Sequence, residues 1–159
     1  MKLKLLLTAA LVLLTAIPLS MTAQSQAPVA NTSHVSISDR SAYTAEINKL
    51  RHDNGLQPLT LNTRLDNSAQ AKANHIRDNN YWSHDYKDIT PWTFINESGY
   101  HYKKAGENLA HCYDTVEETI QGWLDSPTHK ANMLGDYKDI GIGESISNDC
   151  KVIVTHFGR

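Results

Sequence analysis

The first hydrophobic feature of the chain is a nearly unbroken apolar run over residues 5–19, which only Thr8, Thr15 and Pro18 interrupt. A short basic start, residues 1–4, comes before it. Its length of about 15 residues falls short of the roughly 20 that a membrane-spanning helix needs. The pattern is typical of a secretory signal peptide, and an uncleaved N-terminal anchor is the alternative.

The chain after this run divides into a polar leader and one domain. We expect cleavage after Ala23, which makes residues 1–23 the signal peptide. Residues 24–38 are polar and show neither a helical nor a strand period, so we expect a disordered leader. Residues 39–159 suffice for one domain with a real hydrophobic core. The expected mature chain is secreted and has no transmembrane segment.

Helical periodicity dominates the first two thirds of the domain. Residues 39–54 place Tyr43, Ile47 and Leu50 on one face, and Gly55 follows as a stop. A short extended link leads from there to a second helix.

The second helix is expected to begin after Asn62, a good N-cap residue. Its apolar face is made of Leu65, Ala69, Ala73 and Ile76. Because several of these side chains are small, a neighbouring element can approach this helix closely.

Three shorter helices are expected where a capping residue, twice followed by proline, precedes an apolar pattern. Their expected spans are Thr90-Pro91 to Gly99, Asp114 or Thr115 through Leu124, and Ser126-Pro127 through Met133. Gly135 follows the last of them as a stop.

The hydrophobic period changes to two near the C-terminus. Residues 139–146 and 151–157 alternate between apolar and polar positions, and a turn over residues 147–149 separates them. We expect these two segments to pair as an antiparallel hairpin, with residues 105–110 as a candidate third strand. Helices first and strands last predict an α+β fold, in which helices cover an antiparallel sheet.

The charge of the chain argues against nucleic acid as a partner. The formal net charge is −2, and loss of Lys2 and Lys4 with the signal peptide changes it to −4. The longest basic cluster is Lys103-Lys104. Binding to nucleic acid requires many clustered Lys and Arg side chains to neutralise phosphates.

The sequence contains two cysteines, Cys112 and Cys150. In an exported chain an even pair of cysteines favours a disulfide. The loop of about 38 residues that it closes would contribute roughly 3–4 kcal/mol of stability. A zinc-binding pair is the alternative, although neither cysteine has the CxxC neighbour typical of such sites.

Three polar residues in distinctive surroundings are candidates for a functional site. His84 follows the second helix, Glu107 interrupts an apolar stretch, and His129 follows the cap at Ser126. A carboxylate placed like Glu107 must be solvated in a cleft or paired, because burying a lone charge is costly. The helix dipole near His129 disfavours the imidazolium, and metal ligands and bases need a neutral ring. For any single histidine, a structural or surface role is the more frequent one.

Several of these segments, in this order, resemble one family. They are Leu56-Gln-Pro-Leu59 with Leu61-Asn62, Ser83-His84, Gly106-Glu-Asn-Leu-Ala110, Trp123-Leu-Asp-Ser-Pro-Thr-His-Lys-Ala-Asn-Met-Leu134, Ile140-Gly-Ile-Gly143 and Phe157-Gly158. Over about residues 40–159 the chain resembles the CAP superfamily, or SCP domain, of cysteine-rich secretory, antigen 5 and pathogenesis-related proteins. Its bacterial secreted branch is the most similar.

The resemblance implies a three-layer α-β-α sandwich with a metal-binding cleft. In the family, two histidines and one or two glutamates line this cleft and can bind a divalent metal, often zinc. The matching positions here are His84, Glu107 and His129. The family's second glutamate is replaced by Ser126, which Asp125 precedes. Three protein ligands and a water would give a zinc site with one open position.

Three functions are compatible with such a site. The first is a binding module that holds a divalent metal and a small apolar ligand, an extracellular protein or a cell-wall component. The second is an extracellular hydrolase, in which a metal-bound water attacks and Glu107, with His84 and His129, carries the chemistry. The third is a structural accessory of the cell wall. Because the sequence shows no carboxylate that orients either histidine, we expect binding rather than catalysis.

Two further polar groups have predicted roles. Asn108 and Asn132 are expected to hold loops through hydrogen bonds to the backbone, as such residues mainly do in the family, and contact with a ligand is the alternative. Ser145 lacks the G-x-S-x-G turn of serine hydrolases, so a serine nucleophile is not expected.

Overall fold

The computed structural model describes residues 37–159 of the chain. The predicted signal peptide, residues 1–23, lies outside this range, as does the leader up to residue 36, and both stay predictions. Within the described part, no helix combines the length and the apolar character that crossing a membrane requires.

The five helices that the periodicity predicted are all present. They are α1 (Ile37–Asp53), α2 (Thr63–Asn79), α3 (Pro91–Glu97), α4 (Val116–Leu124) and α5 (Pro127–Met133). The side chain of Asn62 caps α2 by accepting a hydrogen bond from the backbone N–H of Arg64 at 3.0 Å. Thr115 and Glu118 form a capping box at the start of α4, so Thr115 rather than Asp114 is the cap.

The strands form a single four-stranded sheet in the order β1-β3-β4-β2. Its members are β1 (Thr60–Leu61), β2 (Ala105–His111), β3 (Asp139–Ser147) and β4 (Cys150–Gly158). The hairpin of β3 and β4 is confirmed, as is the third strand β2, which pairs antiparallel with β4.

One strand was missed by the sequence analysis. The link after α1 ends in β1, whose two residues pair parallel to β3. The sheet is therefore mixed and not purely antiparallel as expected. The hydrophobic pattern could not reveal a two-residue strand, because its pairing depends on where β3 lies in space.

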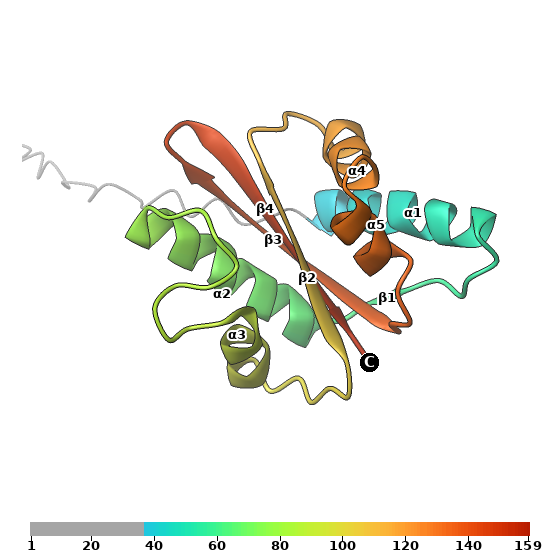
Figure 1. Ribbon diagram of the computed structural model, residues 1–159, viewed down its shortest axis with the longest axis horizontal. Helices are drawn as coiled ribbons and strands as arrows, with labels where there is room; N and C mark the ends of the chain where they lie inside the picture. The colour runs from blue at the N-terminus through green and yellow to red at the C-terminus, as the bar shows by residue number, and fades with distance from the viewer. Residues whose placement is uncertain (1–36) are drawn as a thin grey trace, which may run out of the picture. The chain divides into compact units, whose positions relative to one another are not determined.

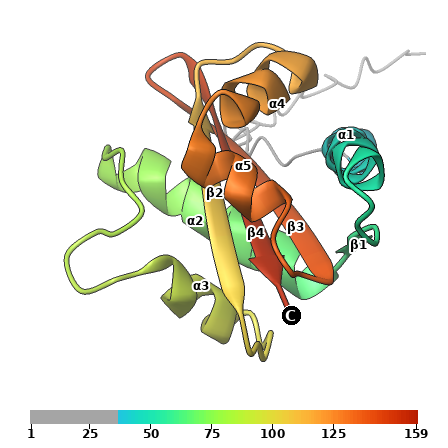
Figure 2. The same ribbon diagram turned by 45° about the vertical axis from the view of Figure 1, so that its right-hand side comes forward.

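The helices lie on both faces of the sheet and form the predicted α-β-α sandwich (Figures 1 and 2). Helices α2 and α3 pack together on one face, with α2 against β3 and β4. Helices α1, α4 and α5 cover the other face. The larger core lies under these three, around Tyr43, Ile47 and Trp123.

The close approach predicted for α2 is present and depends on two glycines of β3. A Cβ atom on Gly141 would lie 2.1 Å from the carbonyl carbon of Leu65, and one on Gly143 would lie 2.2 Å from that of Ala69. Both distances are far inside van der Waals contact. Glycine at these positions therefore lets the backbone of α2 lie directly on β3.

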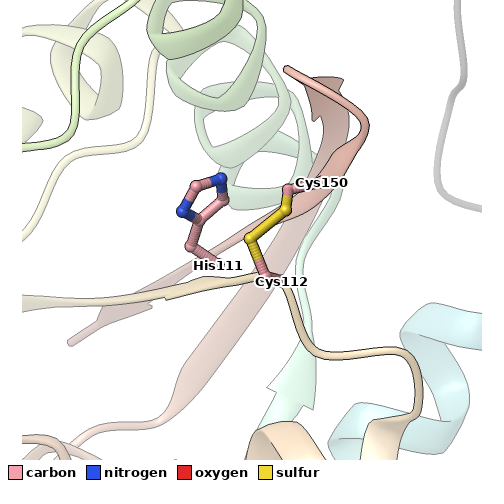
Figure 3. A group of neighbouring side chains, drawn as sticks. All are labelled: His111, Cys112 and Cys150. Atoms are coloured by element: carbon pink, nitrogen blue, oxygen red, sulfur yellow. A yellow bond between two sulfur atoms is a disulfide. The ribbon is translucent and has the colours of Figure 1, made fainter.

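A disulfide joins Cys112, just after β2, to Cys150, the first residue of β4, with an S–S distance of 2.08 Å. The predicted disulfide is confirmed, so in this structure the two sulfurs do not form the alternative zinc-binding pair. Figure 3 shows the bond together with the imidazole of His111.

Candidate functional site

Glu107 is the centre of the candidate site. It lies in the middle of β2 and is only 5% exposed. One carboxylate oxygen lies 2.6 Å from Nδ1 of His84, and the other lies 2.9 Å from Nε2 of His156. The carboxylate is thus paired, which is one of the two arrangements that the sequence analysis allowed.

The charge state of Glu107 follows from these contacts. Burial by itself would raise the pKa of this carboxyl group, but the hydrogen bonds from His156 and His84 outweigh burial and hold the pKa below its usual range. An ionised carboxylate only accepts hydrogen bonds, so both imidazole nitrogens that face it carry a proton. Glu107 therefore fixes which nitrogen of His84 is protonated.

His84 lies in the segment between α2 and α3, and its side chain is 54% exposed. Its hydrogen bond to Glu107 raises the pKa of the imidazole, against the opposing effect of partial burial. Because Nδ1 binds Glu107, Nε2 is the ring nitrogen that can contact a ligand. The sequence revealed no carboxylate that orients a histidine, but in the structure Glu107 orients the ring of His84.

His156 is a site residue that the sequence analysis missed. It is fully buried on β4, directly opposite Glu107 in the antiparallel register. Its Nδ1 lies 2.7 Å from the hydroxyl of Ser68, which also donates to the carbonyl of Leu65 at 2.9 Å. Nε2 of His156 donates to the carboxylate of Glu107, so one of the two partners of this carboxylate is a fully buried imidazole. Only the strand register brings these two residues together.

Lys72 is a second residue that the sequence analysis missed. It lies on α2, is completely buried, and burial lowers the pKa of its ammonium group. Its Nζ donates to the hydroxyl of Tyr81 at 3.1 Å, to the carbonyl of Ser83 at 3.2 Å and to the carbonyl of His84. These bonds fix the backbone of the segment that carries His84.

His129 lies in the first turn of α5, as predicted. Burial, together with the positive charge of His84, lowers the pKa of its imidazole. A neutral ring was expected here from the position near the helix N-terminus, and the structure adds that His129 is within electrostatic reach of His84.

Asn108 and Asn132 hold the backbone around the site. The amide of Asn108 donates to the carbonyl of His129 at 3.0 Å, and that of Asn132 donates to the carbonyl of Glu107 at 2.9 Å. The two side chains also bind each other at 2.9 Å. The predicted structural role of this pair is confirmed.

Two cavities open beside the histidines. The first has a volume of about 450 Å³ and is lined by His84, Asp85, Pro91, Trp92, Ala105, Gly106, Glu107 and Asn132. The second, of about 330 Å³, includes Trp82, Trp123 and His129 in its wall. Asp125, beside the position of the family's second glutamate, is exposed and accepts a hydrogen bond from Gln121. It is a wall residue of neither cavity.

Among residues 37–159, one group of three His, Cys, Asp or Glu side chains has all its ligand atoms within 4.8 Å of one another. This group is His111, Cys112 and Cys150, and its two sulfurs share the disulfide. The ligand atoms of His84, Glu107 and His129 are more widely spaced. The predicted trio is therefore not drawn together as a closed cation site in this conformation.

Comparison with known proteins supplies the family. Residues 44–157 match the model of the cysteine-rich secretory protein family, CAP. This chain belongs to the CAP family. Its CAP domain is 34% identical over 119 residues to the uncharacterized protein YkwD of Bacillus subtilis, covering 71% of this chain and 46% of that protein. It is 31% identical over 98 residues to the uncharacterized membrane protein YlbC of the same organism, covering 60% and 28%. The chain thus spans less than half the length of these relatives.

Solved CAP structures have the same fold. An outer surface protein from Borrelia burgdorferi superposes with a TM-score of 0.72 at 24% identity, covering 79% of this chain and 96% of that one. An extracellular protein with an SCP domain from Bacillus anthracis superposes with a TM-score of 0.69 at 26% identity, covering 77% and 40%. In this CAP domain, the residues that the family resemblance selected, His84 and Glu107, are in direct contact.

Proposed function

We propose that this CAP protein is a secreted binding module, in which His84 and His129 hold a divalent cation such as Zn²⁺ beside a cavity for a small ligand or a loop of a partner. The observation that carries the proposal is the buried carboxylate of Glu107, hydrogen-bonded to Nδ1 of His84 at 2.6 Å. A carboxylate behind one ring nitrogen is the usual support of a histidine that ligates a metal through the other.

The charge states of the side chains fit a cation. Nε2 of His84 is the nitrogen left for a ligand, and the lowered pKa of His129 keeps its imidazole neutral. Metal binding requires neutral imidazole, so a cation would displace the second proton of His84. Both oxygens of Glu107 are engaged by histidines, which supports an orienting role for this residue. Water or a bound molecule would complete the coordination.

The first cavity supports a small ligand beside this cation. Its volume of about 450 Å³ lies in the range of roughly 300–1,000 Å³ that is usual for ligand pockets. Trp92, 37% exposed, and Pro91 offer apolar surface, while His84 and Asn132 offer polar contacts. A molecule with an apolar part and a few polar groups suits such a wall.

The same contacts favour binding over hydrolysis. A general base at neutral pH works best with a pKa near the working pH. The pKa of Glu107 is held low, and its carboxylate is shielded by His84 and His156. Glu107, which would be the base in a hydrolase, thus positions the rings of His84 and His156 instead. Extracellular placement is supported by the disulfide and by relatives described as extracellular or outer-surface proteins.

Thermal unfolding with and without Zn²⁺ tests the proposal. A cation that binds only the folded state at 100 times its Kd stabilises the protein by about 2.7 kcal/mol, which raises the melting temperature. The double variant His84→Ala/His129→Ala should lose this shift. His52→Ala, an exposed histidine on α1, is the matched control and should keep it. A shift that persists in the double variant would show that the cation binds elsewhere.

A further inference from the structure

A second place in the fold gathers metal-binding side chains, away from Glu107. The ligand atoms of His111, Cys112 and Cys150 all lie within 4.8 Å of one another where β2 ends and β4 begins (Figure 3). We propose that reduction of the disulfide converts this group into a binding site for a thiophilic cation of the Zn²⁺ class. The inference is independent of the function proposed for His84 and His129.

The backbone holds the three residues together without the disulfide. His111 lies opposite Val152 in the antiparallel ladder of β2 and β4, and the N–H of Cys112 donates to the carbonyl of Lys151 at 2.9 Å. Cys150 closes the β3–β4 hairpin opposite Ser147. Breaking the S–S bond removes none of these hydrogen bonds, so the two thiols remain neighbours after reduction.

The imidazole of His111 is also held in place. Its ring stacks on Trp82 with 4.9 Å between centroids and 29° between planes. Stacking limits the rotation of the ring and reduces the entropy that coordination would cost. Two of the three ligands then come from neighbouring residues on one strand end, and the third comes from the adjoining strand.

Both a reductant and a cation can reach the group. Cys112 is exposed, while His111 and Cys150 are half-buried. A small cavity of about 150 Å³ opens beside them, with His111, Ser147 and Asn148 in its wall. A buried structural disulfide would lack this access.

The reductant in this proposal is a dithiol. The dithiol gives two electrons and two protons to the Cys112–Cys150 bond and leaves as its own disulfide, so that two thiols form. A divalent cation then displaces both thiol protons and binds two thiolates and one imidazole nitrogen. Two sulfurs and one nitrogen, with water as the fourth ligand, match the tetrahedral preference of Zn²⁺. The oxidised pair offers no thiolate, so disulfide and cation exclude each other.

The test uses Co²⁺ as a spectroscopic substitute for Zn²⁺ on the full mature chain. The protein is reduced with dithiothreitol, freed of reductant without oxygen, and titrated with Co²⁺. We expect a near-ultraviolet thiolate-to-cobalt charge-transfer band that saturates at one equivalent and disappears when Zn²⁺ is added. The oxidised protein should show no such band, whether or not Co²⁺ binds at His84 and His129.

Two variants identify the ligands. His111→Ala should weaken Co²⁺ binding to the reduced protein by at least about tenfold. Mutation of a residue that merely supports a metal ligand already causes a loss of this size. His101→Ala, an exposed histidine before β2, is the matched control and should bind as the unaltered protein does. Cys112→Ser/Cys150→Ser should abolish the band.

Three results would overturn the proposal. The first is a reduced protein without the band. The second is His111→Ala binding as tightly as the control. The third is loss of the far-ultraviolet circular dichroism of the folded backbone on reduction, because the site requires an intact β2–β4 ladder. The Zn²⁺-induced melting shift of the oxidised protein tests the other site separately, so the failure of one proposal can be told from that of the other.

Discussion

The buried pair of Glu107 and His156 allows a sharp prediction about stability. His156→Leu removes the hydrogen bond at 2.9 Å to Glu107 and leaves a carboxylate that is 5% exposed with His84 as its remaining partner. Leaving a buried acceptor without its partner costs about 1–3 kcal/mol, and more when the acceptor is charged. A small domain has only about 5–15 kcal/mol of stability in total. We therefore expect the urea midpoint of His156→Leu to lie well below that of the unaltered protein.

Urea unfolding, followed by circular dichroism, measures this cost. Ser145→Ala is the matched control, because Ser145 is also fully buried on the sheet and donates one neutral hydrogen bond at 2.7 Å to Ala73. Its loss should cost only about 1 kcal/mol. The chemical difference between the two variants is the charge left behind on Glu107.

A double-mutant cycle with Glu107→Leu measures the interaction between the two side chains. Replacing both members of a buried pair by apolar side chains is often nearly neutral, so the double variant should be much more stable than the sum of the single losses predicts. The reasoning would be refuted if His156→Leu costs no more than Ser145→Ala, or if the two single losses simply add.

Three other features, a glycine of β3, the His84–Glu107 contact and the disulfide, have testable effects on stability. Gly143→Ala should destabilise the protein by about 1–3 kcal/mol or more, because the added Cβ would lie 2.2 Å from the backbone of Ala69. A urea midpoint equal to that of the unaltered protein would contradict the close approach of α2. The contribution of the His84–Glu107 contact to stability should depend on pH in both directions. The pKa of His84 is raised in the folded protein, so its contribution to stability is complete below the ordinary pKa of 6.5 and is lost as the pH rises through the pKa of the folded state. The pKa of Glu107 is lowered in the folded protein, so its contribution is complete above the ordinary pKa of 4.5 and is lost as the pH falls through the pKa of the folded state. Melting curves in a metal chelator should therefore show the difference between the unaltered protein and His84→Ala at its largest between about pH 4.5 and 6.5, and a difference that grows above pH 7 would contradict this. Reduction of the disulfide should lower the stability by about 3–4 kcal/mol and leave the protein folded at 25 °C, and mass spectrometry that finds two free thiols in protein from the culture medium would show that the bond is absent there.

Local patterns in the sequence determined most of the elements. Asn62 and Thr115 capped the helices that follow them, and the prolines at 91 and 127 occupy first helical positions, because capping depends on a few neighbouring residues. The change of period near residue 139 predicted the β3–β4 hairpin for the same reason. Two cysteines in a chain that is predicted to be exported were enough to predict the disulfide.

The environment of the candidate site was decided by the tertiary structure alone. The sequence selected His84, Glu107 and His129 by resemblance, and it required a partner for Glu107 without identifying one. His156 faces Glu107, 49 residues away in the sequence, because of the register between two strands. Lys72 reaches the carbonyl of His84 because the segment after α2 folds back on that helix. A hydrophobic period records which face of an element is buried, but it carries no information about which residue of another element lies opposite. Partners, protonation states and spacing of the site residues are therefore properties of the packed fold.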